Sequence, residues 1–297
     1  MLGSFSGRLY ASSLLRTCLE RGLFVPGESI QYLVFDVESV ADGNLIARVR
    51  YPEEKLSGDE ATSRYRAELL EKYNSDFIPY TFQVPVSVVV GKVDAQFRLM
   101  EIVALDEPEF RSHIITKHFW QGWEAYRQPT LVSFNGRTFD IPLLELAAFR
   151  YGLSVPRWFA PGARSYEQPR NRYNASFHLD LMEVLTNFGA SRFNGGLNLA
   201  ANLLGKPGKM DVQGSMVQDL YEQGALQEIN DYCRCDVLDT YFTFLRANVM
   251  LGHLELADEQ QIVLDTKQWL ENKSAETAVY QRYLNHWGDW ENPWVDS

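Results

Sequence analysis

The sequence contains few cysteines and no long apolar run. Its 297 residues include only Cys18, Cys233 and Cys235, which are too few for a disulfide framework and favour a reducing compartment, the cytoplasm in our prediction. No stretch of about 18 apolar residues occurs, so we expect no membrane span. Cys233 and Cys235 also lack the spacing of a metal site or a redox motif, and we expect two ordinary helix cysteines.

Positive charge is scarce over the chain as a whole. The net charge of −11 argues against a protein that coats nucleic acid with its entire surface. Residues 137–209 differ, because they hold nine Lys or Arg against five Asp or Glu. This basic middle on an acidic chain predicts a localised anion site. The apolar share of 45% and the charged share of 23% are ordinary globular values that allow a sizeable core.

The hydrophobic pattern predicts an α/β fold with a mixed sheet flanked by helices. The expected strands lie at 31–36, at 130–135 and within 84–105, where a turn at 92–94 separates two strands of a hairpin. An insert over 42–80 carries a helix at 59–73. The other expected helices are 108–126, 140–151, 196–204, 214–223 and 225–249, with 152–176 as a loop and order resuming at 177–185.

The stretch YLVFDVES (32–39) places Asp36 and Glu38 at the end of the first expected strand. At a spacing of two in extended chain, both carboxylates point to the same side. Two like charges held close are costly unless a divalent cation lies between them, and Mg²⁺ and Mn²⁺ prefer carboxylate oxygens. The same residues also fit a solvated turn, which is the commoner setting for so short a motif.

Two further acidic motifs follow. In SFNGRTFDIPLL (133–144), Asp140 comes at the mouth of a helix, where it fits either an active-site acid or an N-cap. In YCRCD (232–236), Tyr232 and Asp236 are four residues apart on one helix, so their side chains can converge on one point. Taken alone, that pair also fits an ordinary helix with a core tyrosine and a solvated aspartate.

The ordered set of three motifs is more specific than any one of them. Asp-x-Glu, then Asn-x-x-x-Phe-Asp-x-Pro, then Tyr-x-x-x-Asp resembles the DEDD exonuclease superfamily, in the subgroup with tyrosine in the third motif. More narrowly, the chain is similar to the 3′→5′ proofreading domain of family B DNA polymerases and to stand-alone predicted exonucleases of that type. The stretches HLDLMEVL and GGLNLAANLLGKPGK are also similar to the stand-alone family. The resemblance implies a ribonuclease H-like fold with an N-terminal extension (1–29), an exonuclease domain (30–250) and an acidic C-terminal helical tail (251–297).

The resemblance also implies a set of roles. Two Mg²⁺ or Mn²⁺ ions would be held by four acids. Asp36 would bridge both ions, Glu38 and Asp236 would complete the first site, and Asp140 would hold the second partly through water. Tyr232 would orient the attacking water or a phosphate oxygen, because a phenol with a pKa near 10 is poorly suited to be the base.

Substrate contacts are expected around the second motif and on the basic middle of the chain. Asn135 and Phe139 flank the motif and are candidates to touch the terminal nucleotide, although Phe139 also fits a core position. The candidate phosphate contacts are Arg137, Arg170, Arg172, Lys206 and Lys209. Asp180 is a candidate to support the metals, or else a helix cap, and His178 fits a structural role.

The leading hypothesis is therefore a metal-dependent 3′→5′ exonuclease that acts on nucleic acid with a free 3′ end, single-stranded DNA in the first place. The 3′→5′ direction follows from the resemblance, not from residue spacing. An exoribonuclease of the same fold is an alternative, because the metal site does not read the 2′-hydroxyl. A catalytically inactive nucleic-acid-binding module is another, and the presence of all four acids and the tyrosine argues against it.

Overall fold

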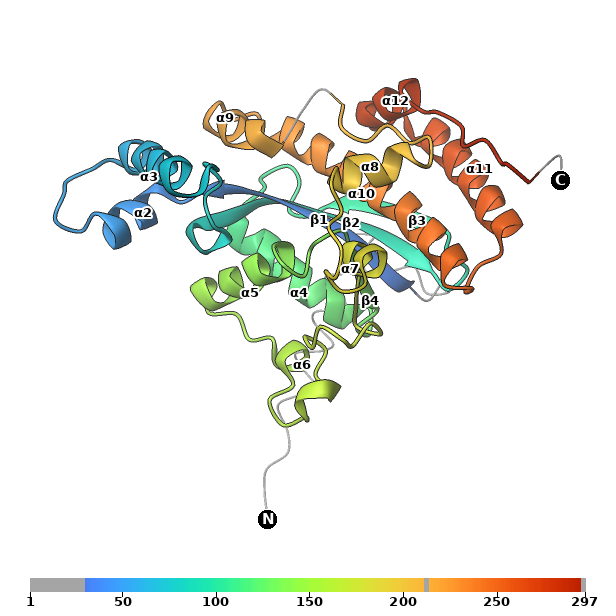
Figure 1. The fold of residues 1–297 in the computed structure, drawn as a ribbon, viewed down its shortest axis with the longest axis horizontal. Helices are drawn as coiled ribbons and strands as arrows, with labels where there is room; N and C mark the ends of the chain where they lie inside the picture. Colours follow the sequence, from blue (N-terminus) through green and yellow to red (C-terminus); the bar gives the residue numbers. More distant parts are fainter. Residues whose placement is uncertain (1–29, 211–213, 295–297) are drawn as a thin grey trace, which may run out of the picture.

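The computed structural model describes residues 30–210 and 214–294, so the expected N-terminal extension lies outside the described residues. A twisted sheet occupies the centre, with α4 and α5 on one face and α10 on the other, while α2 and α3 project from one end (Figure 1). The strands are β1 (Ile30–Ala41), β2 (Gln83–Asp94), β3 (Leu99–Ala104), β4 (Thr130–Ser133) and β5 (His178–Asp180). The helices are α2 (Gly43–Arg50), α3 (Gly58–Tyr73), α4 (Ser112–Ala125), α5 (Asp140–Tyr151), α6 (Pro156–Phe159), α7 (Leu181–Thr186), α8 (Gly196–Asn202), α9 (Val217–Glu222), α10 (Leu226–Met250), α11 (Leu256–Lys273) and α12 (Ala278–Asn285).

The strand order in the sheet is β3-β2-β1-β4-β5. The first three strands form an antiparallel meander, while β4 and β5 run parallel to β1. The parallel pairs require crossovers, which the helices between them supply. The prediction of a ribonuclease H-like mixed sheet flanked by helices is confirmed.

The first strand is longer than the sequence pattern indicates. β1 continues to Ala41 because it stays paired with β2, and Asp36 lies opposite Val89 in that ladder. The two acids therefore lie inside the strand and not after its end. On the other side, the pairing with β4 extends only to Val34 opposite Val132. Beyond that point β4 no longer pairs with β1. The carboxylates of Asp36 and Glu38 lie where the chain leaves β4.

The hairpin turn also differs from its predicted position. β2 continues to Asp94, and the turn falls at 95–98. Lys92, which we expected in the turn, stands opposite Glu101 in the ladder, and their side chains form a 2.6 Å ion pair. An opposite-charge pair across two strands lets a buried lysine remain in the sheet, a pairing that a local pattern does not reveal.

Within the insert, the helix α2 was missed. It is only eight residues long and begins at an Asp42 cap, whose carboxylate accepts from the amide of Leu45 over 3.0 Å. α2 and α3 pack on each other around a small apolar cluster of their own, formed by Ile46, Tyr51, Ala61, Tyr65, Leu69 and Ile78. The main core is separate from this cluster and joins the sheet to α4, α5 and α10.

The C-terminal helices α11 and α12 pack against α10 and not away from it. Leu270 and Tyr283 are fully buried in the same core as the sheet. Among the described residues, no helix is both long and apolar enough to cross a membrane.

Candidate active site

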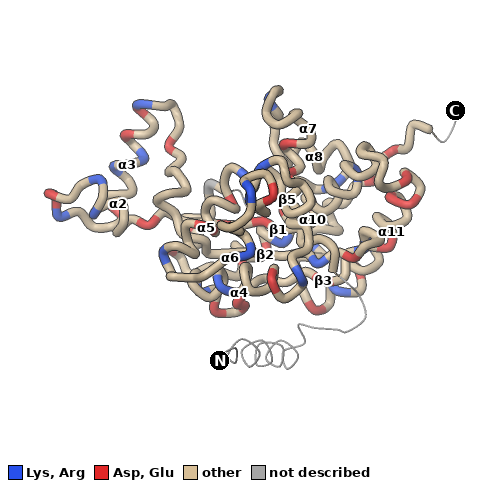
Figure 2. The backbone as a smooth tube through the Cα atoms, turned by 90° about the horizontal axis from the view of Figure 1, so that it is seen from below, with Lys and Arg blue, Asp and Glu red and all other residues tan. Residues whose placement is uncertain are grey.

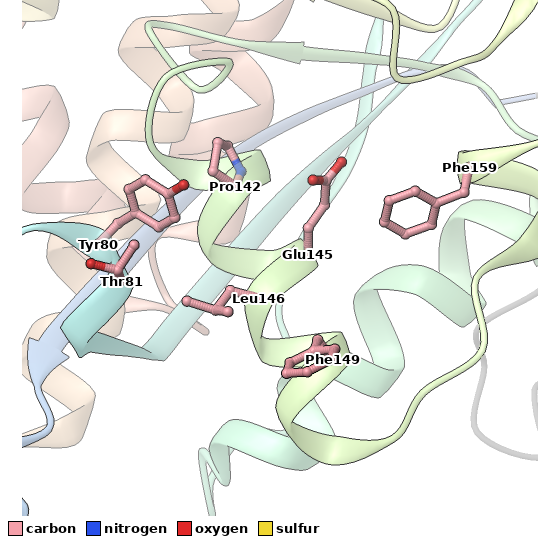
Figure 3. A pocket seen from close by; sticks show the side chains of 7 residues that line it. All are labelled: Tyr80, Thr81, Pro142, Glu145, Leu146, Phe149 and Phe159. Carbon is pink, nitrogen blue, oxygen red and sulfur yellow. The ribbon is translucent and has the colours of Figure 1, made fainter. Parts of the chain in front are cut away.

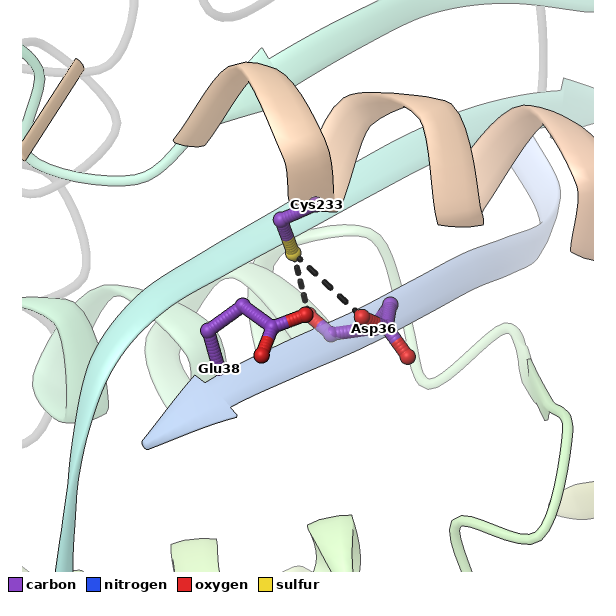
Figure 4. Close-up of side chains that lie close together, drawn as sticks. All are labelled: Asp36, Glu38 and Cys233. Atoms are coloured by element: carbon purple, nitrogen blue, oxygen red, sulfur yellow. Dashed lines mark hydrogen bonds between the residues drawn. The ribbon is translucent and has the colours of Figure 1, made fainter. Parts of the chain in front are cut away.

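The first acidic pair lies on the face of β1 that α10 covers. Asp36 and Glu38 are both partly buried, and the thiol of Cys233 on α10 lies between them and the helix (Figure 4). The Cys233 sulfur is 3.4 Å from the backbone oxygen of Asp36 and 3.5 Å from a side-chain oxygen. One ligand atom from each of the three residues falls within 4.8 Å of the others.

The helix α10 delivers the third motif to the same place. Its apolar side, which includes Val237 and Leu238, is fully buried and fixes the rotation of the helix on β1 and β2. Tyr232 and Asp236 then share the side next to the acidic pair, and the tyrosine hydroxyl interacts with the Asp236 carboxylate. Residues four apart on a helix are neighbours on one face.

Asp140 enters from the end of β4, on the other side of β1. It is the first residue of α5 and is buried, but the N-cap residue, Phe139, makes no side-chain cap bond. The alternative of a simple N-cap at Asp140 is therefore wrong, and its carboxylate is left for other partners. Gly136 in the preceding turn is needed for close approach, since a Cβ there would lie 2.8 Å from Asp140 Oδ2.

Asp180 holds this turn in place. Its carboxylate accepts from the backbone amides of Asn135 and Arg137 at 2.9 Å, and it also caps α7 through the amide of Met182 at 3.0 Å. The second motif is thereby tied to the end of β5, the neighbouring strand. The sequence left two roles open for Asp180, support of the metals or a helix cap. The contacts show the helix cap, and the same carboxylate also binds the backbone of the turn before Asp140.

Electrostatic interactions link Asp140 and Asp236 to the first acidic pair. Burial raises the pKa of Asp36 to about 6. Burial raises the pKa of Glu38 well above its ordinary value, and the charges of Asp36, Asp236 and Asp140 raise it further. The pKa values of Asp140 and Asp236 are raised by burial and by the charge of Asp36. Four buried carboxylates, three of which are further disfavoured in their ionised form by neighbouring acids, need a compensating positive charge.

A divalent cation fits this donor set. The oxygens are carboxylates, which suit hard ions such as Mg²⁺ and Mn²⁺. Burial and the charges of Asp36 and Glu38 raise the pKa of the Cys233 thiol well above its ordinary value. The protonated thiol acts as a donor to Asp36, and its soft sulfur suits a hard cation less well than the carboxylate oxygens do.

Two residues expected at phosphates are placed elsewhere. The Arg137 guanidinium is enclosed in the protein, where it pairs with Glu183 at 2.8 Å and donates to the backbone oxygen of His178 at 2.7 Å. The Lys206 ammonium is also buried, and it donates to the carbonyls of Leu204 and Gly288 at 3.2 Å. Both cations serve internal contacts in place of the predicted ones.

Three further candidate substrate contacts are Lys209, Asn135 and Arg170. Lys209 is exposed, and its charge lowers the pKa of Asp236 against the effect of burial. Asn135 is in the left-handed region at φ 66° and its side chain accepts from the Thr138 hydroxyl at 2.7 Å. Arg170 pairs with Glu145 at 2.8 Å along α5.

Two neighbours of the site were missed by sequence reasoning. Cys233 is three residues before Asp236, a spacing that already places it near the same helix face. Phe77, from the segment after α3, lies with its ring centre 5.7 Å from that of Phe139 and is 60% exposed. No local signal connects Phe77 to the second motif, because 61 residues lie between Phe77 and Phe139 in the chain.

A hollow of about 290 Å³ lies along α5 (Figure 3). Its lining is mostly apolar and consists of Tyr80, Thr81, Pro142, Glu145, Leu146, Phe149 and Phe159. None of the titratable groups of the acidic cluster lines it, so we assign the chemistry to the acids and not to this hollow.

Comparison with known proteins agrees with this geometry. A family model described as a predicted 3′–5′ exonuclease related to the exonuclease domain of PolB matches residues 75–287. The matched segment contains Asp140, Tyr232 and Asp236, whereas Asp36 and Glu38 precede it on the central strand. A search of curated proteins finds no match to the chain.

Proposed function

The chain belongs to the family of predicted 3′–5′ exonucleases related to the PolB exonuclease domain, and we propose that it removes nucleotides from 3′ ends by metal-dependent hydrolysis. The observation that carries the proposal is the convergence of four carboxylates, from β1, α5 and α10, whose pKa values are raised by burial and, for Glu38, Asp140 and Asp236, also by neighbouring acids. Such a cluster is stable in its charged form only when it holds cations.

In this proposal, Asp36, Glu38, Asp140 and Asp236 hold two Mg²⁺ or Mn²⁺ ions. Bound ions of this kind supply Lewis-acid chemistry, which makes water nucleophilic at neutral pH and neutralises charge on a leaving oxygen. The protein fixes the ligands from a rigid frame. Asp36 and Glu38 lie within β1, Asp140 is the first residue of α5, and Asp236 lies on one face of the buried helix α10.

Tyr232 acts as a donor in this mechanism. Burial and the charges of Asp236 and Glu38 raise its pKa above the ordinary value, so the phenol keeps its proton at neutral pH. A protonated phenol can orient a water or a phosphate oxygen but cannot accept a proton from it. Asp180 positions Asp140 indirectly, because it fixes the turn that precedes α5.

The proposed substrate is single-stranded DNA with a free 3′ end. Support comes from the family and from the exposed Lys209, whose charge lowers the pKa of Asp236 and which offers a cation to a phosphate. The exposed aromatic ring of Phe77 against Phe139 offers a flat apolar surface for an unpaired base next to the same motif.

The test is a digestion of 5′-labelled DNA and RNA oligomers in Mg²⁺, Mn²⁺ or EDTA. We expect a ladder that shortens from the 3′ end, disappears in EDTA and is lost in Asp36→Asn. The matched control is Asp219→Asn, since Asp219 is an exposed acid on α9. Faster shortening of RNA than of DNA would show that RNA, and not single-stranded DNA, is the preferred substrate. A folded protein that shortens neither oligomer would overturn the proposal.

A further inference from the structure

Two exposed aromatic rings lie together beyond the acidic cluster. Tyr173 precedes β5 and Phe188 follows α7, yet their ring centres are 5.4 Å apart. Tyr173 is 70% exposed and Phe188 is 51% exposed. Large rings are usually buried, so an exposed pair held in mutual contact indicates a surface that binds something.

The backbone keeps Phe188 in an unfavourable conformation to make this contact. Its φ is 57°, in the left-handed region that a bulky residue seldom adopts. The amide of Phe188 donates to the carbonyl of Glu183 at 2.8 Å, which closes the end of α7 and fixes the ring outward. Strain of this kind persists where the surroundings enforce it, and it is concentrated at binding and catalytic sites.

The charge around the two rings is positive. Arg172 lies over the Tyr173 ring at 5.6 Å, and Arg192 is exposed with no ion pair among the residues that the structure describes. Between 168 and 192 the acids are Asp180 and Glu183, and both are buried. Several Lys and Arg positions surround β5 and α7 (Figure 2). Residues 168–192 therefore offer cations and aromatic faces without an exposed carboxylate of their own.

This surface is built onto the same framework as the second motif. Glu183 pairs with Arg137, inside the motif, at 2.8 Å and with Arg172 at 2.5 Å. Phe193, in the segment that follows Phe188, packs edge-on against Phe134 with ring centres 5.8 Å apart. Phe134 is the residue before Asn135, so the exposed rings and the turn before Asp140 share a rigid connection.

We propose that Arg172, Tyr173, Phe188 and Arg192 bind the single-stranded part of a nucleic acid, several nucleotides away from the end that reaches the acids. Unpaired bases stack on the two rings, and the arginines neutralise phosphates. Charge complementarity favours this occupant over an apolar peptide, because a polyanion with exposed flat bases matches both features. The inference rests on the proposed function for its place along the substrate, but binding itself does not require hydrolysis.

The experiment measures binding of a labelled 16-nucleotide and a 4-nucleotide DNA strand by fluorescence anisotropy in EDTA. It uses the full chain, Tyr173→Ala, Phe188→Ala and the control Phe149→Ala, which removes an 84% exposed ring on α5. We expect the two surface variants to weaken binding of the 16-mer by roughly tenfold or more. Binding of the 4-mer and of a blunt duplex should not change, and the control should bind as the unchanged protein does. Arg192→Gln should lower the slope of log K against log salt by about 0.7.

The outcomes separate this inference from the proposed function. Selective loss of 16-mer binding supports the surface, even if the unchanged protein cleaves no oligomer and the proposed function fails. Unaltered 16-mer binding by both ring variants overturns the surface, even if cleavage is robust. Loss of binding in the Phe149 control to the same extent also overturns it, since the effect would then not be specific to these rings. If the unchanged protein does not bind the 16-mer, the inference is wrong.

Discussion

The thiol of Cys233 on α10 approaches a side-chain oxygen of Asp36 on β1 at 3.5 Å, across 197 residues of sequence. The contact joins the helix to the central strand at the acidic cluster. Because the thiol pKa is raised well above its ordinary value, chiefly by burial, the sulfur keeps its proton and donates a hydrogen bond to the carboxylate. Cys233 therefore orients Asp36, and its soft sulfur suits a hard cation less well than the carboxylate oxygens do.

Replacement of this thiol should separate donation from metal ligation. Cys233→Ser keeps a donor, and we expect it to retain about half or more of the hydrolysis rate, since one hydrogen bond contributes only about 1 kcal/mol. Cys233→Ala should be slower, with unchanged affinity for Mg²⁺. The measurement is the rate as a function of Mg²⁺ concentration. A large loss of Mg²⁺ affinity in Cys233→Ser, equal to that in Asp36→Asn, would show that the sulfur is a ligand.

Stability should depend on pH and on Mg²⁺ together. The Asp36 pKa is about 6 in the folded protein against an ordinary 3.8. Between these values the folded state keeps a proton that the unfolded state has lost, so the free energy of unfolding rises as pH falls through this window. Without metal, Tm should be higher near pH 5 than near pH 8, by about 2–4 °C for each kcal/mol.

Mg²⁺ should act in the opposite direction, because it binds the ionised carboxylates. We expect it to raise Tm at pH 8 and to have little effect at pH 5. Thermal unfolding in EDTA and in Mg²⁺ over this range measures both trends, and Asp36→Asn should flatten them. A metal-free protein that gains stability from pH 5 to pH 8 through the same group would contradict the assignment.

Tyr232→Phe should lower kcat by roughly 10- to 100-fold with little change in KM, because the lost hydroxyl orients the reacting groups rather than the bulk of the substrate. The pH profile of kcat should keep its shape, since a phenol with a raised pKa does not titrate in the working range. Steady-state rates across pH provide the measurement, with the exposed Tyr221→Phe on α9 as the control. Disappearance of one limb of the profile would identify the tyrosine as the base.

The two lysines of LLGKPGK should behave differently. Lys209→Ala should raise KM and reduce the salt slope of single-strand binding by about 0.7, the effect of one lost phosphate contact. Lys206→Met should leave that slope unchanged and lower Tm, because the buried ammonium holds Gly288 and lies 4.0 Å over the Trp287 ring. Burial lowers the Lys206 pKa to about 8. An equal loss of slope in both variants would show that Lys206 also contacts phosphate.

Local pattern was sufficient for much of the framework. The helix at 140–151 was predicted at its true ends, since Pro142 fits a first turn and Gly152 takes the left-handed conformation at φ 66° that ends it. The mixed sheet followed from apolar runs that alternate with helical patterns. The motif order also indicated which four acids should lie together, and the structure brings them together, although their catalytic roles remain predictions.

Tertiary structure decided which charges are available. Lys206 and Lys209 are three residues apart in a basic loop, yet Lys206 is covered by the C-terminal segment, whereas Lys209 is exposed and its charge lowers the pKa of Asp236. Arg137 lies within the second motif, but its guanidinium forms an ion pair with Glu183 on α7. Burial of a charged side chain depends on which distant segment packs over it, and no local periodicity encodes that segment.

The sequence by itself therefore determined the residue types, their spacing and the elements that carry them, because helix and strand periodicity are properties of neighbouring residues. The tertiary structure alone decided that β1 extends past Asp36, that Cys233 touches this acid, and that Phe77 lies against Phe139. These are contacts between segments far apart in the chain, and only the packing of the complete core fixes them.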